Sequence, residues 1–532
     1  MLLLETIMLR RLINNTPLHF LIVFVVAVIA HLPTLNMYFY LDEWGALYDF
    51  THHPATNYLF TTNNYYLLFK SFGLNATGYY AVGIFIYALS AALFYLFVEK
   101  LFKNKTMGLI AGILYATSPV GTSTATMLWT YIAEGGYPLS IMLLLLLYFL
   151  LKFARERKLI YFVLVAIGFA YFLELEPRRV FLFLPVMLLF DYIISNKKLL
   201  PTIGFFVRQA ILFGSFVAYY NYDIAISEVI TKGKVTIAES LLDGGAKLDF
   251  GIKALTHMKP LVTLTNVLLG GPWVLLSSRL TGYVDQYNVD HMRALSIVTC
   301  LISAGLVILA WKVKREWGLI SLFSLAWVYF IILGFYIFSS PGVSDTAHRT
   351  LSPAAPGYAL FFTVSSVSLF TYLKKKKVAK VNNLKRIFIL GFFVLAGLNL
   401  FATHYGFNKF VTFYSKPARA FYKNLKNFYP TFPPNSLIYI ETPRDVHIKY
   451  QLSRIYGGNP YGVAASVAVF YPEIKKEELL LVTNFVEVEK FVNEDPSRLD
   501  HTFGFYFDKT GLQNKTEETR ASLRKNFTKE RL

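Results

Sequence analysis

Long apolar runs separated by short polar segments fill the sequence from residue 18 to residue 404. The runs have the length that an α-helix needs to cross the hydrocarbon core of a bilayer. The pattern therefore predicts about eleven membrane-spanning helices. The predicted spans are 18–35, 79–98, 107–133, 137–151, 159–175, 180–194, 203–220, 294–311, 317–338, 356–373 and 387–404.

Two apolar stretches depart from this simple pattern. The run 107–133 is interrupted by Pro119 and Gly121, so its helix is expected to break. The stretch LVTLTNVLLGGPWVLL, 261–276, is short, is divided by two glycines and a proline, and has no basic flanks. We expect it to be re-entrant or interfacial, because irregular backbone at membrane depth is tolerated only where protein or water satisfies it.

Basic residues occur in alternate connections between the runs, at 10–11, 100–105, 152–158, 197–198, 312–315 and 374–386. The positive-inside rule places these connections in the cytoplasm, with the N-terminus inside and the C-terminus outside. The first run has no small-residue cleavage pattern after Leu35, so we interpret it as a helix and not as a signal peptide. The predicted outer loops are then 36–78, 176–179, 223–293 and 339–355.

The composition becomes polar after residue 405. This part contains the strand-like runs SLIYIE (436–441), LLLVTNFV (479–486) and HTFGFYFD (501–508), which indicate a small mixed α/β domain outside the membrane. The predicted fold is therefore an all-α polytopic membrane domain, residues 1–404, followed by an extracytoplasmic domain, residues 405–532.

Composition supports an integral membrane protein, with 55% hydrophobic and 16% charged residues in 532 and a mean hydropathy of +0.45. The formal charge of +19 resides largely in the predicted cytoplasmic connections, a pattern that argues against nucleic-acid binding. The single cysteine, Cys300, cannot form an intramolecular disulfide.

Two adjacent carboxylates, Asp42 and Glu43, follow the first predicted helix on its outer side. At this position a carboxylate could act on the head group of a substrate whose lipid tail remains in the bilayer. Transfer of a sugar from a sugar phosphate needs a base that takes the proton of the acceptor hydroxyl, and either carboxylate could be that base. The alternative is a solvated helix end with charges at the membrane interface.

Two other predicted outer segments carry charged residues. Glu134 is followed by Gly135 and Gly136 at the outer end of its run. A carboxylate at this position usually pairs with another group or has a functional role. The alternative is a charged loop residue without such a role. In the turn LELEPRR, 173–179, Arg178 and Arg179 either form salt bridges with the two glutamates or grip a phosphate.

His348 and Arg349 precede a helix that starts with prolines, in SDTAHRTLSPAAPGYAL, 344–360. A cation at this position can meet a lipid phosphate, or it can extend to the interface as a structural residue. If they assemble in space, Asp42, Asp49 and Glu134 are candidate ligands of a divalent cation, Mg or Mn. No Walker or Rossmann glycine loop occurs, which argues against direct use of ATP or a dinucleotide.

The acidic pair, followed by FKSFGLNATGYYAVGIFIYALSAALFYLFVEKLF (69–102) and GILYATSPVGTSTATMLWTYIAEGGYPLSIMLLLLLYFLL (112–151), resembles the polytopic membrane glycosyltransferases of GT-C type. Within this class the sequence is most similar to the group of protein O-mannosyltransferases and aminoarabinose transferases. The likeness extends over residues 18–400 and is strongest up to residue 185.

The resemblance implies an outward-facing active site, a dolichyl- or undecaprenyl-phosphate sugar donor, and inversion at the anomeric carbon. It implies that Asp42 is the base with Glu43 beside it, and that Glu134 matches the acidic residue of the second outer segment. Residues 173–185 resemble the family's Lys-Glu stretch before a proline, and 348–357 resemble its Arg-Tyr motif, although Thr350 follows Arg349 here.

The sequence therefore predicts a multi-pass plasma-membrane glycosyltransferase that takes a sugar from a polyprenyl-phosphate donor to a protein, lipid or glycan acceptor. One alternative is a transporter or flippase for lipid-linked saccharides, which would carry charges near mid-membrane and have pseudo-symmetric halves. A second is an O-antigen-ligase-like transferase that would use the histidines and arginines of 223–293. A third is a non-catalytic membrane scaffold.

Overall fold

The protein is described here by a computed structural model, which covers residues 15–41, 43–52, 60–133, 136–175, 180–195, 202–231, 257–280, 285–338, 342–378, 380–456 and 463–530. The chain forms two compact units. The first, called the membrane unit, comprises Met1–Leu32, Val82–Ala125 and Thr130–Gly406; the second unit comprises Pro33–Ala81, Thr126–Trp129 and Phe407–Leu532.

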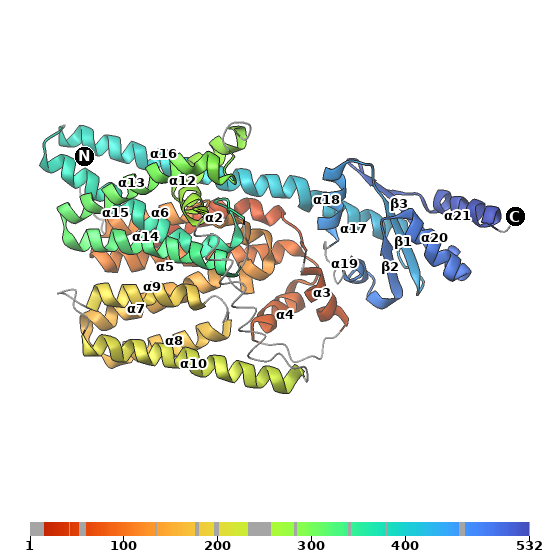
Figure 1. The fold of residues 1–532 in the computed structure, drawn as a ribbon, viewed down its shortest axis with the longest axis horizontal. Helices are drawn as coiled ribbons and strands as arrows, with labels where there is room; N and C mark the ends of the chain where they lie inside the picture. The colour runs from red at the N-terminus through yellow and green to blue at the C-terminus, as the bar shows by residue number, and fades with distance from the viewer. Residues whose placement is uncertain are drawn as a thin grey trace. The chain divides into compact units, whose positions relative to one another are not determined.

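The membrane unit is built from helices (Figure 1). Eight helical segments among the described residues are long and apolar enough to cross a membrane, and four shorter apolar helices accompany them. The predicted polytopic helical architecture is thus confirmed. The helices are α2 (Thr16–His31), α5 (Ala76–Phe102), α6 (Lys105–Ala116), α7 (Tyr137–Glu156), α8 (Leu159–Leu175), α9 (Val180–Ser195), α10 (Ile203–Thr231), α12 (Lys259–Leu280), α13 (Val289–Val313), α14 (Arg315–Phe338), α15 (Ala355–Lys375) and α16 (Val381–Phe410).

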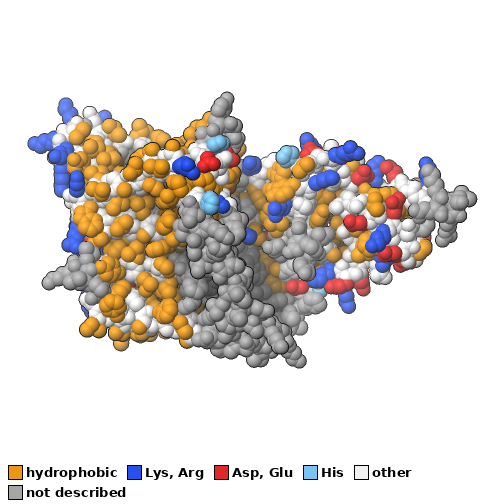
Figure 2. All heavy atoms as spheres, in the orientation of Figure 1, with side chains coloured by type: hydrophobic (Ala, Val, Ile, Leu, Met, Phe, Trp, Pro, Cys, Tyr) orange, Lys and Arg blue, Asp and Glu red, His pale blue; other side chains and the backbone are white. Residues whose placement is uncertain are grey.

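Among the described residues, the connections that carry basic residues lie together at one end of the membrane unit, here called the basic end. Arg155, at the end of α7, donates a hydrogen bond to the carbonyl of Leu101, at the end of α5, at 2.9 Å. Arg208, near the start of α10, lies 5.3 Å from the centre of the Phe153 ring. Figure 2 shows lysines and arginines gathered at this end and hydrophobic side chains along the flank of the unit. This separation is the one that the positive-inside rule requires.

Helix α12 turns back instead of crossing the unit. The carbonyl of Lys259, at its start, accepts a hydrogen bond from the Tyr336 hydroxyl at 3.1 Å, and Tyr287, just beyond its end, donates to Asp345 at 3.1 Å. Both contacts are made near the end of α14, so α12 enters and leaves at the same end of the unit. The helix breaks at Gly270, whose φ of +55° and ψ of −138° suit glycine. This course agrees with the prediction that the stretch is re-entrant or interfacial, although its length and composition alone would allow a span.

The end of the membrane unit away from the basic end, here called the loop end, is closed by two paired loops. The N–H of Gly121 donates to the carbonyl of Thr346 at 2.9 Å, and the N–H of Ser123 donates to the carbonyl of Ala347 at 2.8 Å. These bonds satisfy backbone groups of the run 107–133, whose helix ends at Ala116 in agreement with the predicted break.

The second unit contains a four-stranded sheet of order β2-β1-β3-β4. Strand β1 (Ser436–Glu441) pairs in parallel with β2 (Leu479–Val482) and β3 (Thr502–Asp508), and β4 (Gly511–Asn514) pairs antiparallel with β3. Leu437, Val488 and Leu523 lie in the core between the sheet and its helices. The other helices of this unit are α3 (Glu43–His52), α4 (Phe60–Phe72), α17 (Lys416–Phe428), α18 (Val446–Ile455), α19 (Val463–Ala468), α20 (Phe485–Glu494) and α21 (Thr516–Glu530).

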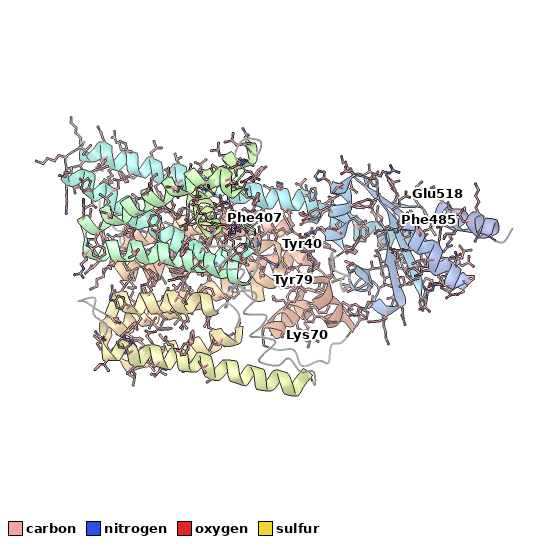
Figure 3. The ribbon with its side chains drawn as sticks, viewed as in Figure 1. Tyr40, Lys70, Tyr79, Phe407, Phe485 and Glu518 are labelled. Atoms are coloured by element: carbon pink, nitrogen blue, oxygen red, sulfur yellow. The ribbon has the colours of Figure 1, made fainter. Side chains whose placement is uncertain are left out.

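The three predicted strands are present, and the middle one is shorter than its apolar run. It ends at Val482 because Asn484 caps helix α20, its side-chain oxygen accepting the N–H of Val486 at 3.2 Å. Phe485, labelled in Figure 3, then packs its ring against Tyr439 of β1, with 5.5 Å between the ring centres. The unit boundary at Phe407 lies close to the predicted domain boundary, and the unit also takes in Pro33–Ala81, which includes the first predicted outer loop, 36–78.

The close approach at Gly121 generates a stability prediction. Its φ is +73°, and a Cβ there would lie 2.2 Å from the backbone nitrogen of Ser352. Gly121→Ala should therefore lower the stability of the folded protein by at least the roughly 1–2 kcal/mol of a left-handed alanine. Thermal unfolding in detergent measures this, with Gly305→Ala, where a Cβ meets nothing within 4 Å, as the matched control. Equal melting temperatures for the two variants would contradict the described pairing of loops.

Candidate functional site

Glu43 is buried in the second unit and is bound by backbone N–H groups. It is 2% exposed and starts helix α3, whereas its neighbour Asp42 lies outside the described residues. One carboxylate oxygen accepts the N–H of Tyr40 at 2.8 Å, and the other accepts the N–H of Leu128. Hydrogen bonds to an ionised carboxylate are among the stronger ones, so Glu43 ties the loop before α3 to residues 126–129.

The surroundings of Glu43 fix helix α3 further. The indole N–H of Trp44 donates to the carbonyl of Ile455 at 3.0 Å, and its ring lies 4.8 Å from the Tyr422 ring of α17. Burial raises the pKa of Tyr65 well above its ordinary value, and the charge of Glu43 raises it further. Tyr40, labelled in Figure 3, packs its ring against Phe410 at 5.1 Å. This arrangement supports a positioning role for Glu43.

Leu41, the residue before Asp42, adopts the left-handed conformation with φ of +53°. This conformation costs a non-glycine residue roughly 1–2 kcal/mol, and such strain tends to persist where the surrounding structure over-determines it, often at functional sites. In the sequence, Asp42 therefore follows a residue with a strained backbone and precedes a buried carboxylate that accepts two hydrogen bonds.

Glu134 and Gly135 lie outside the described residues, and the residues on both sides of them pack against His31 in the membrane unit. His31 is fully buried at the end of α2, and its Nδ1 lies 2.9 Å from the Tyr131 hydroxyl. Its ring stacks on Tyr87 at 3.7 Å and meets Tyr137 edge-on at 5.7 Å. Sequence reasoning did not select His31, because a lone histidine inside an apolar run gives no pattern.

Arg178 and Arg179, the other predicted phosphate ligands, also lie outside the described residues, together with Glu176. The structure describes the helices on either side of this turn, α8 and α9. The phosphate-binding role of the two arginines stays a prediction.

His348 and Arg349 are described, and both are half-buried at the loop end of the membrane unit. The imidazole Nδ1 of His348 accepts the N–H of Thr350 at 3.3 Å and lies 2.9 Å from the Thr350 hydroxyl. The Thr124 hydroxyl donates to the carbonyl of Arg349 at 2.7 Å. These bonds fix the start of the 3₁₀ segment Arg349–Ala354, which leads into α15.

A buried polar network beneath these two residues escaped sequence reasoning. Asn266 of α12 and Thr263, one turn before it, are both fully buried and bond to Ser344, which precedes His348 in the same loop. Asp345 accepts a hydrogen bond from Tyr287. The available signal was a single asparagine inside the apolar run 261–276, which is unusual because a buried amide needs several partners.

Among the described residues, no group of three or more histidine, cysteine, aspartate or glutamate side chains could hold a metal ion. Of the three carboxylates predicted to assemble around a hard cation, only Asp49 lies within the described ranges. A site for Mg or Mn built from Asp42, Asp49 and Glu134 therefore stays a prediction.

These features define a multi-pass membrane protein whose helix bundle has a basic end and, away from it, an end of tightly hydrogen-bonded loops that carries His348 and Arg349. No protein-family model matches the sequence, and no curated protein matches it.

Solved structures with a similar chain include transferases of GT-C type, the class that the sequence resembles. ArnT from Cupriavidus metallidurans bound to undecaprenyl phosphate matches over 92% of this chain and 93% of that chain, with 9% identity and a TM-score of 0.45. The archaeal oligosaccharyltransferase AglB from Archaeoglobus fulgidus, in complex with an inhibitory peptide and a dolichol-phosphate, matches over 93% and 74%, with 12% identity and a TM-score of 0.44.

A further solved structure, of an A. fulgidus oligosaccharyltransferase tethered with an acceptor peptide, matches with 11% identity and a TM-score of 0.43, and this chain spans 64% of its length. Identities near one residue in ten and TM-scores below 0.5 assign neither an activity nor a substrate to this chain.

The bonds of Glu43 generate a second prediction. Glu43→Gln keeps the size of the side chain but replaces one of its two acceptor oxygens with an NH₂ donor. That NH₂ group then faces a backbone N–H, with which it cannot form a hydrogen bond. We expect a loss of about 1–3 kcal/mol in folding stability, the usual effect of leaving a buried polar group without its partner. The matched control is Glu473→Gln, at an exposed position of the same unit. Thermal unfolding that is equally unaffected in both variants would contradict the positioning role.

Proposed function

We propose that this protein is an integral membrane glycosyltransferase that moves a sugar from a polyprenyl-phosphate donor to an acceptor hydroxyl on the extracytoplasmic side, with inversion at the anomeric carbon. The observation that carries the proposal is the fixed loop 344–349, which presents His348 and Arg349 at the loop end of the membrane-spanning helices. A guanidinium at the end of a spanning helix is well matched to the phosphate of a lipid whose tail remains in the bilayer.

In the proposed reaction Asp42 accepts the proton of the acceptor hydroxyl. The acceptor oxygen forms a bond to the anomeric carbon from the face opposite the phosphate, while the bond between that carbon and the phosphate oxygen breaks. The electron pair leaves with the polyprenyl phosphate. Arg349 stabilises the negative charge on this leaving group, with His348 as a second donor and Arg178 and Arg179 as further candidates, and such electrostatic stabilisation is usually the largest catalytic contribution. Glu134 is a second candidate acid or base, and Glu43 positions the loop that carries Asp42.

The distribution of basic residues supports the proposed sidedness. The basic end faces the cytoplasm under the positive-inside rule, which places the N-terminus inside and the loop end, with His348 and Arg349, outside. The C-terminal domain is extracytoplasmic in this proposal because the last predicted span, 387–404, starts from the basic connection 374–386.

The buried charges favour an enzyme over a transporter of lipid-linked saccharides. Of the described Asp, Glu, Lys and Arg residues in the membrane unit, the buried ones are Glu99, Asp191 and Arg208. Glu99 lies in the last turn of α5, and Asp191 and Arg208 pair at 2.9 Å near the connection of α9 and α10. A transport pathway typically places its charges near mid-membrane, whereas these three charges lie near helix ends.

The proposal is tested by transfer of radiolabelled sugar from a panel of polyprenyl-phosphate sugars by the purified protein. Asp42→Asn should reduce transfer by about 10²-fold or more, because general-base catalysis contributes that much. Asp500→Asn, at an exposed position of the C-terminal domain, should transfer like the wild type. A parallel assay with EDTA tests the proposed role of Mg or Mn. Wild-type protein that binds every donor but never cleaves one would exclude the glycosyltransferase and favour the flippase or scaffold.

A further inference from the structure

Asn266 lies fully buried in the first half of the broken helix α12, and its side chain is completely engaged. Its Nδ2 donates to the carbonyl of Ser344 at 2.9 Å and to that of Gln286 at 3.2 Å. Its Oδ1 accepts the indole N–H of Trp273 at 3.0 Å. One amide thus joins the segment between α12 and α13, the loop before α15 and the second half of α12. Because every partner is itself buried or part of a backbone, each of these bonds is costly to lose.

Two threonines complete the attachment of the loop to α12. The hydroxyl oxygen of Thr263 accepts the N–H of Ser344 at 3.2 Å and lies 2.6 Å from the Tyr336 hydroxyl. The hydroxyl of Thr346 donates to the backbone carbonyl of Asn266 at 2.7 Å. The loop is therefore held to α12 on both sides of Asp345 before it reaches His348.

The other face of the same loop is held by residues 121–124. The carbonyls of Thr346 and Ala347 accept the backbone N–H groups of Gly121 and Ser123, and the carbonyl of Arg349 accepts the Thr124 hydroxyl. These bonds set the backbone of the residues that lead to the guanidinium. The Asn266 amide binds the same loop at Ser344, five residues before Arg349.

We propose that Asn266 is a positioning residue for phosphate binding: through Ser344 it holds the loop that places Arg349 against the phosphate of a polyprenyl-phosphate ligand. This inference rests on the proposed function and adds a residue that does not touch the ligand. A guanidinium binds phosphate through two parallel hydrogen bonds, so a displacement of its backbone weakens the interaction even when the charge is retained.

The variants Asn266→Asp and Thr263→Val test the inference, with Thr265→Val as the matched control. Asn266→Asp keeps the shape of the side chain but replaces the group that donates to two carbonyls with an acceptor. Thr263→Val removes the acceptor of the Ser344 N–H. Thr265 is also fully buried in α12, but its hydroxyl donates to the carbonyl of Leu261 in its own helix at 2.9 Å. Thr263→Val is the milder change and tests the same loop if Asn266→Asp does not fold.

Equilibrium binding of radiolabelled undecaprenyl phosphate to the purified full-length protein is the measurement. We expect Asn266→Asp and Thr263→Val to raise the Kd by about tenfold, and Arg349→Ala by at least as much. Thr265→Val should bind like the wild type. In the double variant Asn266→Asp/Arg349→Ala the two losses should not add, because Asn266 acts through Arg349.

The possible outcomes separate the two levels of the proposal. Wild-type protein that binds no undecaprenyl phosphate, or Arg349→Ala that binds it like the wild type, would contradict the proposed function itself. Loss of binding in Arg349→Ala together with wild-type binding in both Asn266→Asp and Thr263→Val would overturn only the positioning role. Fully additive losses in the double variant would also overturn it, since a purely structural asparagine would act independently of Arg349.

Discussion

Backbone groups at the ends of membrane helices must find hydrogen-bond partners within the protein, and the loop end of this molecule is organised by that constraint. Where α6 ends at Ala116, the following residues do not remain exposed to lipid but pair with the loop before α15. Gly121 permits the close approach, and Asn266 and Thr263 supply side-chain partners from the broken helix α12. The rigidity of this end follows from the same bonds that make it compatible with a bilayer.

That constraint also determines which residues are available for chemistry. In the second unit Glu43 is occupied by two backbone N–H groups, so it holds the chain on one side of Asp42 and is poorly placed to exchange protons with a substrate. In the membrane unit the His348 imidazole accepts the N–H of Thr350, and the carbonyl of Arg349 accepts the Thr124 hydroxyl. In the proposed glycosyltransferase Glu43 fixes the chain, while Asp42 and Arg349 act on the ligand.

Local patterns in the sequence predicted much of the fold. Hydropathy identified the membrane helices, the doubled glycine and proline identified the break in α12, and strand-like runs identified β1 and β3. The pairing of residues 121–123 with 346–347 could not be predicted in this way, because it joins segments more than two hundred residues apart and depends on how helices pack. The same holds for Asn266, whose partners come from three separate segments, and for the inclusion of 33–81 in the unit of the C-terminal domain. For the candidate site, Arg349 and the acidic pair are predictions from the sequence, and only tertiary structure shows that Glu43 is buried and bound by backbone N–H groups.

The most direct test of the central claim is an electron cryomicroscopy structure of the protein with undecaprenyl phosphate, in a lipid nanodisc. Our account predicts density for the phosphate within hydrogen-bonding distance of the Arg349 guanidinium, with the lipid tail along the membrane unit and the loop 344–349 unchanged. A phosphate bound at the basic end, or away from Arg349 altogether, would contradict the account.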